Sequence, residues 1–446
     1  MGASMTTATT IEAEAKTPDE TRRLSAEDAK ILGLSALGGA LEFYDFVIYV
    51  FFASAVQTLF FPANMPGWLS MLQTFGIFAM GYLARPLGGI VMAHFGDMIG
   101  RKKMFMFSIL LMALPTLLIG LLPTYATIGY AAPVLLLIFR VCQGAAIGGE
   151  APGAWVFVAE HAPKRHVALA CGALSCGLVF GILMGSIVVV ICDAIYSHAD
   201  QITLGIWRYP FLLGGVLGLV TLWLRRYLQE TPVFARIQAR KGADKRLPLK
   251  EVLAKHGKAV GLSMLVTWML TGVVVVILLM LPNMLPRLTH TLSDGTMHLA
   301  NMVAIIMTCV GCLMSGFMAD RVGEGRALAT FSVGVAVTFT AFYATAMSAY
   351  SDTLLFVTYA LTGFFVGIIG VIPALIVRIF PAEIRFSGVS FSYNVAYAVF
   401  GGATPILLTM VITKMTWAPV VYICALSLMG IVIGAVLTRQ GVRRYI

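Results

Sequence analysis

Charged residues are scarce in this chain of 446 residues. Only 12% are Asp, Glu, Lys or Arg, whereas soluble globular proteins carry about 25%. Hydrophobic residues make up 59%, and the apolar segments lack the period-two alternation of membrane barrel strands. These absences exclude a soluble fold and a barrel, and they leave an all-α membrane protein.

Catalytic and metal-binding patterns are missing as well. The sequence has no paired nucleophile and base, no metal-ligand cluster and no glycine loop that would bind phosphate. Its 7 histidines are scattered, and its 7 cysteines lie in or beside apolar segments. Cys309 and Cys312 form a C-x-x-C whose place in an apolar segment predicts packing. We therefore expect a protein that is not an enzyme and that has no metal or other cofactor.

Apolar runs of about 20 residues, long enough to cross a hydrocarbon core of about 30 Å, recur along the whole chain. We predict twelve transmembrane helices, over 31–58, 69–94, 103–124, 130–159, 166–192, 209–226, 257–285, 296–319, 326–349, 352–380, 386–413 and 416–438. Gly177, Gly181 and Gly185 recur every four residues and predict a close helix–helix contact. Pro373, Pro381 and Pro405 predict bends in the second half.

The basic residues predict how these helices are oriented. Of the 31 lysines and arginines, all but Arg85, Arg140, Arg208, Arg287 and Lys414 lie in the two tails or in alternate loops on the same side. Positively charged loops stay in the cytosol, so we expect both termini to be cytoplasmic, in a bacterial-type inner membrane. The net charge of +10 is a topology signal, and we expect a lipid bilayer around the protein and no nucleic-acid partner.

A short charged turn occurs twice, half a chain apart. The copies are Gly96-Asp97-Met98-Ile99-Gly100-Arg101-Lys102-Lys103 and Gly316 followed by Asp320-Arg321-Val322-Gly323-Glu324-Gly325-Arg326. Such a repeat indicates two homologous halves. We predict an N-terminal tail (1–30), a six-helix bundle (31–226), a cytoplasmic linker (227–256), a second six-helix bundle (257–438) and a C-terminal tail (439–446).

The aspartates of these turns can accept hydrogen bonds from the N-terminus of a neighbouring helix or pair with arginine. We interpret the turns as a cytoplasmic gate, although a topological anchor is the simpler alternative. The predicted gate residues are Asp97, Gly100, Arg101, Lys102, Asp320, Arg321 and Gly323. Met98 stands where the second copy has Arg321, so we expect the two copies to act unequally.

Three charged residues are predicted to lie near the middle of the membrane. Glu42 and Asp45 are three residues apart on the first helix, and Arg140 is about ten residues into the fourth. An ionisable group there costs about 2.5–3.5 kcal/mol and normally faces a partner or an aqueous path. We predict Asp45 and Glu42 as proton-coupling residues and Arg140 as the ligand of an anionic substrate, because its fork binds both carboxylate oxygens. The alternative is an ion pair that only joins the two helices.

The remaining candidates are less central. Glu150 is a third proton-coupling candidate, and Glu150 and Arg85 could equally form gating pairs near the cytosolic ends of their helices. The other predicted substrate-binding residues are Arg85, Gln143, Tyr44, Trp268, Tyr359, Tyr393 and Asn394. The second half has no charge deep within its helices 7 and 10, so we expect charge chemistry in the first half and shape recognition in the second.

The repeated turn resembles the loop signature of the major facilitator superfamily, with Ala93 and Met98 as departures in the first copy. Longer motifs resemble its metabolite:proton symporter family. They lie at 41–46, 84–89, 140–144, 148–150, 159–163, 207–211, 230–234, 380–385, 392–394 and 400–405. Glu383 and Arg385, from one of these motifs, join the predicted gate. The resemblance implies two six-helix bundles around a central cavity, and relatives that carry α-ketoglutarate, citrate, shikimate or proline and betaine.

We therefore expect a proton-coupled symporter that imports a small organic acid, with one, two or three carboxylates, by alternating access. Its partner is a small-molecule substrate, the proton is the coupling ion, and we expect a monomer. Proton-driven efflux of a drug or toxic metabolite and symport of a zwitterionic osmolyte are the transport alternatives. A channel and a membrane sensor that does not transport are more remote ones.

Overall fold

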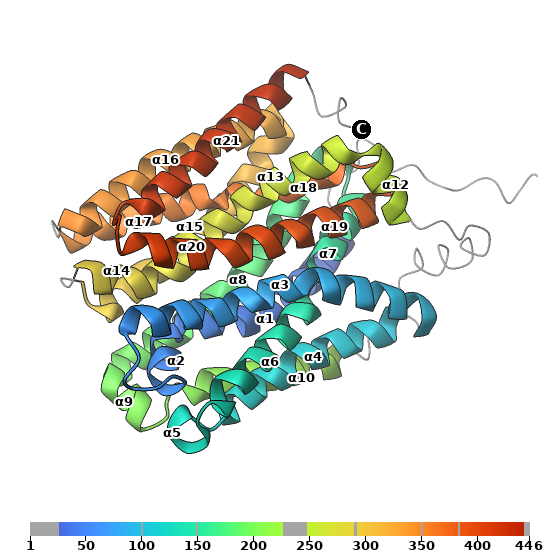
Figure 1. Ribbon diagram of the computed structural model, residues 1–446. Helices are drawn as coiled ribbons and strands as arrows, with labels where there is room; N and C mark the ends of the chain where they lie inside the picture. The colour runs from blue at the N-terminus through green and yellow to red at the C-terminus, as the bar shows by residue number, and fades with distance from the viewer. Residues whose placement is uncertain are drawn as a thin grey trace, which may run out of the picture.

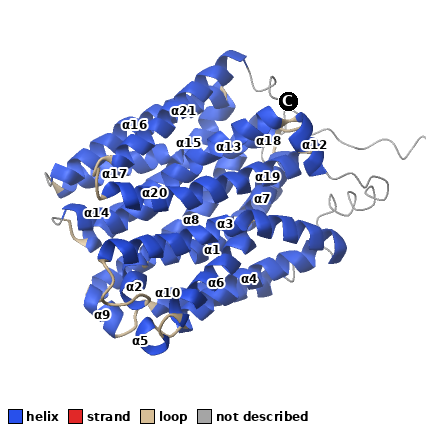
Figure 2. Cartoon of the chain, viewed as in Figure 1, coloured by secondary structure: helices blue, strands red, loops and turns tan. Residues whose placement is uncertain are grey.

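The computed structural model describes residues 26–99, 101–148, 150–225, 248–289, 292–348, 351–381 and 384–440. All the regular structure within these ranges is helical, and short loops connect the helices (Figure 2). The core of a membrane contains no water that could bond with backbone amides and carbonyls. The apolar segments therefore form helices, in which these groups bond with one another. The predicted fold class is confirmed.

The first bundle contains the helices of the first half. They are α1 (Ala26–Phe51), α2 (Ala53–Leu59), α3 (Gly67–Ile99), α4 (Arg101–Leu121), α5 (Tyr125–Ile128), α6 (Ala131–Ile147), α7 (Glu150–His161), α8 (Val167–Ile195), α9 (His198–Thr203) and α10 (Arg208–Arg225). Helices α1 and α2 meet at a bend of 55°. Helices α6 and α7 together make the predicted fourth span.

The second bundle follows the short helix α12 (Pro248–Lys255). It contains α13 (Gly257–Val273), η2 (Val274–Met280), α14 (Leu281–Thr289), α15 (Asp294–Val322), α16 (Glu324–Ser348), α17 (Asp352–Val366), η3 (Gly367–Gly370), α18 (Ile372–Arg378), α19 (Arg385–Ala396), η4 (Tyr397–Gly401), α20 (Gly402–Ile412) and α21 (Ala418–Gln440). The π-helical turn η4 ends at Gly401, four residues before Pro405, and a proline ring clashes with the carbonyl four residues earlier in a regular helix.

Eight of the described helical segments are long and apolar enough to cross a membrane, and α1 with α2 makes a ninth if the bent pair is one span. Helices α3, α4 and α10 occupy the positions of the other three predicted spans. The twelve predicted helices therefore all coincide with helices of the structure.

The two bundles pack side by side, with α8 against α15 and α3 against α20 (Figure 1). Glycines let backbones approach here, since a Cβ on Gly172 would come within 2.6 Å of the Cys312 carbonyl oxygen. The predicted glycine stripe of α8 faces α1, where a Cβ on Gly181 would lie 1.9 Å from the Ala40 carbonyl oxygen. Small residues therefore set the distances on both sides of α8.

The ends of the molecule differ in what they contain. Helix α12 and the C-terminal end of α21 lie at one end, while α2, α5, α9 and α14 lie at the opposite end (Figure 1). The predicted orientation makes the first end cytosolic and the second external. We use these two names below.

Candidate functional site

Arg140 lies on α6 in the interior of the first bundle, with no exposed surface. Its Nη1 donates to the Phe46 carbonyl oxygen at 3.0 Å and to Gln143 Oε1 at 2.7 Å. Its guanidinium carbon lies 4.3 Å from the ring centre of Phe46 and 4.7 Å from that of Tyr49. The faces of these rings stabilise the buried cation.

Arg85 lies on α3 and is 1% exposed. Its guanidinium carbon is 4.2 Å from the ring centre of Tyr397 and 5.4 Å from that of Tyr393, both in the second bundle. A ring of its own helix, Tyr82, lies at 5.9 Å. Arg85 of the first bundle therefore contacts aromatic side chains of the second bundle.

Aromatic contacts connect the two arginines. The Tyr82 ring centre lies 5.0 Å from Phe46, which covers Arg140, and 5.5 Å from Tyr397, which covers Arg85. Trp155 continues the layer, 4.9 Å from Tyr393. We call these side chains, with both arginines, the central layer; its members are Phe46, Tyr49, Phe78, Tyr82, Arg85, Arg140, Trp155, Tyr393 and Tyr397.

Several buried polar atoms of the central layer have no hydrogen-bond partner among the described residues. They are Nε and Nη2 of both arginines, the Tyr393 hydroxyl and Trp155 Nε1, and Asn394 Oδ1 adds an acceptor beside them. A buried donor without an acceptor costs about 1–3 kcal/mol, and more when it is charged. A carboxylate that reached these guanidinium nitrogens would satisfy them with charge-assisted hydrogen bonds.

A polar chain connects Arg140 to Asp45. Gln143 accepts from Arg140 and donates to Thr116 Oγ1 at 2.7 Å. Thr116 itself donates to the Met112 carbonyl oxygen at 2.9 Å and lies close to the Asp45 carboxyl group. Asp45 is 3% exposed and its Oδ1 has no hydrogen-bond partner among the described residues. Glycine on α10 makes this possible, because a Cβ on Gly214 would lie 2.4 Å from Asp45 Oδ1.

Asp45 shares a small cavity with a second carboxyl group. Glu42 and Asp45 line a space of about 10 Å³ between α1, α4 and α10, which is about the volume that one water needs. Two of the three predicted coupling residues, Glu42 and Asp45, therefore lie together and buried, with Gln143 and Thr116 between Asp45 and Arg140. Gln143 and Thr116 lie between Arg140 and Asp45, and no direct ion pair between these two residues is seen among the described residues.

Other predicted binding residues divide into two groups. Tyr393 and Asn394 lie at the bundle interface, where Asn394 Nδ2 donates to the Gly148 carbonyl oxygen at 2.6 Å. Tyr44, Trp268 and Tyr359 have partners elsewhere: the Pro210 carbonyl, the Tyr422 hydroxyl, and the Ile277 carbonyl with Asn301. The structure does not bring these three into the central layer.

The second charged turn contacts the first bundle at the cytosolic end. Asp320 accepts from the backbone amides of Ala168 and Leu169, at 3.0 and 2.8 Å, where α8 begins. It pairs with Arg378 at 3.9 Å and not with the neighbouring Arg321, whose guanidinium covers the Phe317 ring. Gly323 has φ +93°, which glycine adopts without strain.

A second contact crosses the bundles at the same end. Arg385 Nη1 pairs with Glu160 Oε1 at 3.2 Å. Gly100 and Glu383 lie outside the described residues, and so do the side chains of Asp97, Arg101, Lys102 and Glu150. Their predicted roles stay predictions.

Sequence reasoning missed most of the aromatic residues of the central layer. A signal was present, because Phe78, Tyr82 and Arg85 are spaced by four and three and so share one face of α3. Arg378 and Glu324, which pair beside Asp320, carried no such signal. They lie on different helices that only the fold brings together.

Comparison with known proteins agrees with this architecture. A family model described as the Major Facilitator Superfamily matches residues 35–405. The inner membrane metabolite transport protein YhjE of Escherichia coli is 32% identical over 406 residues, which cover 90% of each chain. The glycine betaine/proline/ectoine/pipecolic acid transporter OusA of Dickeya dadantii is 31% identical, over 91% of this chain and 82% of that one.

A solved structure has the same fold. The xylose transporter XylE of Escherichia coli, in a partially occluded inward open conformation, superposes with a TM-score of 0.71 and 15% sequence identity. The match covers 93% of this chain and 98% of that one. At this identity the likeness concerns the fold alone.

Proposed function

Because this chain belongs to the major facilitator superfamily and is a multi-pass transporter of the inner membrane, we propose that it imports a small metabolite that carries a carboxylate, by proton symport and alternating access. One observation carries the proposal. Arg85 and Arg140 are buried among aromatic rings, and both keep guanidinium donors without partners among the described residues. A substrate carboxylate would satisfy those donors with charge-assisted hydrogen bonds.

The polar chain from Arg140 to Asp45 supports the proton-coupled form of this proposal. Burial disfavours a charged carboxylate, whereas a nearby cation favours it. Arrival of an anion at Arg140 would weaken the influence of that cation on Asp45, so substrate and proton would bind together. Asp45 is the coupling residue in this scheme, and Gln143 and Thr116 transmit the change.

The substrate class has two candidates. A small organic acid fits two guanidiniums with free donors. A zwitterionic osmolyte is the second candidate, because aromatic faces bind quaternary ammonium groups and the relative OusA is named as a transporter of glycine betaine and proline.

A binding and uptake screen in proteoliposomes tests the proposal. The panel contains lactate, succinate, citrate, glycine betaine, proline and the neutral sugar xylose, at two external pH values. We expect carboxylate-bearing compounds to stabilise the protein and to accumulate under an inward proton gradient. Preference for xylose, or accumulation that ignores the gradient, would contradict it.

Arg140→Lys tests the role of Arg140 in binding the substrate carboxylate. Lysine keeps the charge and loses the planar fork, so we expect substrate affinity to fall about tenfold or more, equivalent to about 1.4 kcal/mol. Arg208→Lys is the matched control, since Arg208 donates to the carbonyls of Gly120 and Leu122 outside the central layer. Equal affinity in both variants would remove Arg140 from the binding site.

A further inference from the structure

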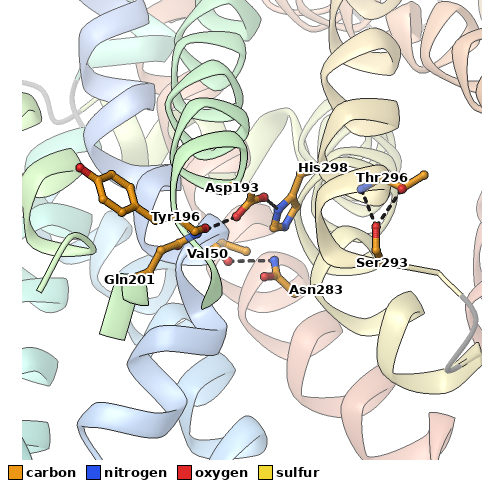
Figure 3. A network of polar contacts seen from close by, with 8 residues as sticks. All are labelled: Val50, Asp193, Tyr196, Gln201, Asn283, Ser293, Thr296 and His298. Atoms are coloured by element: carbon orange, nitrogen blue, oxygen red, sulfur yellow. Dashed lines mark hydrogen bonds and ion pairs between the residues drawn. The ribbon is translucent and has the colours of Figure 1, made fainter. Parts of the chain in front are cut away.

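Three contacts join the two bundles at the external end. His298 Nδ1 on α15 lies 2.5 Å from Asp193 Oδ2 on α8 (Figure 3). Asn283 Nδ2 on α14 donates to the Val50 carbonyl oxygen on α1 at 2.9 Å, and Arg287 on α14 bonds the Gln57 side chain on α2. With the cytosolic contacts of Asp320 and Arg385, the bundles touch at both ends.

The Asp193–His298 pair lies beside a cavity. Both residues line a cavity of about 280 Å³, the external vestibule, which lies between the outer ends of the bundles. A water molecule occupies about 30 Å³ in the liquid, so the vestibule has room for several. Protons can therefore reach this pair from outside without passing the central layer.

The Asp193–His298 pair differs from the other contacts between the bundles because it contains a group that changes charge near neutral pH. Amides and arginine do not change charge in the physiological range, so the contacts of Asn283, Arg287 and Arg385 have a constant charge. Histidine is the residue type that gains or loses its charge between about pH 5 and pH 8. Of the five contacts named for the two ends, only the one at His298 contains such a group.

Other titratable and charged groups lie around the pair. The titratable or charged groups that line the vestibule with His298 are Asp193 on α8, Tyr196 directly after α8, and Asp294 one turn earlier on α15. Around them, Cys192 neighbours Asp193 and Arg287 of α14 lies near Asp294. Helices α1 and α2 contribute no charged side chain to the vestibule. His298 is nine-tenths buried, and its Nε2 has no hydrogen-bond partner among the described residues.

We propose that Asp193 and His298 form an external proton-binding site that latches the two bundles together when it is occupied. A protonated imidazole makes an ion pair with the carboxylate, while a neutral one makes only a hydrogen bond. Opening separates the partners, so the closed state holds the proton more tightly. Closure is therefore favoured in acid and weakens as the external pH rises.

Accessibility of a cysteine in the vestibule tests this site without the need for a substrate. Ala55→Cys replaces a buried residue of the vestibule wall, and Thr203→Cys, exposed on α9, corrects for the reactivity of the thiol itself. Both are labelled with a membrane-impermeant maleimide from outside, in full-length protein in proteoliposomes with a clamped internal pH. Labelled peptides are quantified by mass spectrometry.

We expect the corrected labelling rate of Ala55→Cys to rise by about fivefold from pH 5.5 to pH 8, the lower end of usual coupling strengths. In His298→Gln and Asp193→Asn the rise should disappear, whereas Arg385→Lys at the cytosolic end should keep it. A flat profile in the parent protein overturns the proposal, and so does an unchanged rise in either vestibule variant. Because labelling is read instead of flux, failure here is distinct from failure of the proposed transport function.

Discussion

Asp320 of the second bundle accepts a hydrogen bond of 2.8 Å from the backbone amide of Leu169 in the first. The first amides of a helix have no partner within it, and the helix dipole favours an anion there. The carboxylate therefore caps α8 from the opposite bundle. The bond joins the two bundles at the cytosolic end, so the opening that alternating access proposes would break it.

Asp320→Asn is expected to weaken closure at the cytosolic end. The amide can still accept one bond but lacks the charge, and a hydrogen bond to a charged group contributes about 1.5–3 kcal/mol. The natural cysteine Cys171, buried on the first turns of α8, reports the change. Maleimide labelling of Cys171 from the cytosolic side should accelerate, and Arg321→Gln, which loses only a contact with Phe317, should label like the parent protein.

Thr116→Val is expected to uncouple transport from the proton gradient. Valine keeps the shape of threonine but leaves Gln143 Nε2 without its acceptor. We expect gradient-driven uptake to fall several-fold while substrate counterflow persists. Ser108→Ala is the matched control, because Ser108 on the same helix also bonds α6, at the Ala146 carbonyl, outside the chain to Asp45. Equal effects of the two substitutions would remove Thr116 from coupling.

Asp45→Asn tests the proposed coupling residue itself. The asparagine cannot take up a proton, so accumulation against a concentration gradient should stop, while exchange of substrate at equal concentrations continues. Uptake and counterflow in the same proteoliposome preparation measure the two properties. Accumulation at the level of the parent protein would place the coupling proton on another residue.

Tyr397→Leu is expected to weaken substrate binding. The ligand to use is the carboxylate that stabilises the parent protein most in the screen proposed above. The Tyr397 ring is the one closest to the Arg85 guanidinium, and such contacts contribute about 0.5–2 kcal/mol. Tyr397→Phe keeps the ring and should bind within about twofold of the parent protein, a difference below about 0.5 kcal/mol. Calorimetry measures the affinity of both variants. Equal losses of affinity would show that the Tyr397 hydroxyl, and not its ring, contributes to binding.

Gly181→Ala is expected to destabilise the first bundle. The new methyl group would lie 1.9 Å from the Ala40 carbonyl oxygen, so α1 and α8 must separate, at a cost of about 1–3 kcal/mol. Gly261→Ala on α13 is the control, since a Cβ there meets nothing within 4 Å. Thermal unfolding in detergent should show a lower midpoint for the first variant only.

The sequence alone determined the fold class and the helices. Whether a segment enters the membrane depends on its own hydrophobicity, and the side on which a loop stays depends on its own basic residues. Both properties are local, so they can be read from the sequence. The sequence also pointed to Asp45, Glu42 and Arg140, because a charge in an apolar run is conspicuous in any arrangement.

Only the tertiary structure decided what these residues touch. It placed Gln143 and Thr116 between Arg140 and Asp45, turned Trp268 and Tyr359 toward partners of their own, and brought Asp193 to His298 from another bundle. Apart from the contact between Arg140 and Gln143, which are three positions apart on α6, these contacts join residues tens to hundreds of positions apart, and no periodicity encodes them. Helix packing selects them, because small residues at a few crossing points set which faces meet.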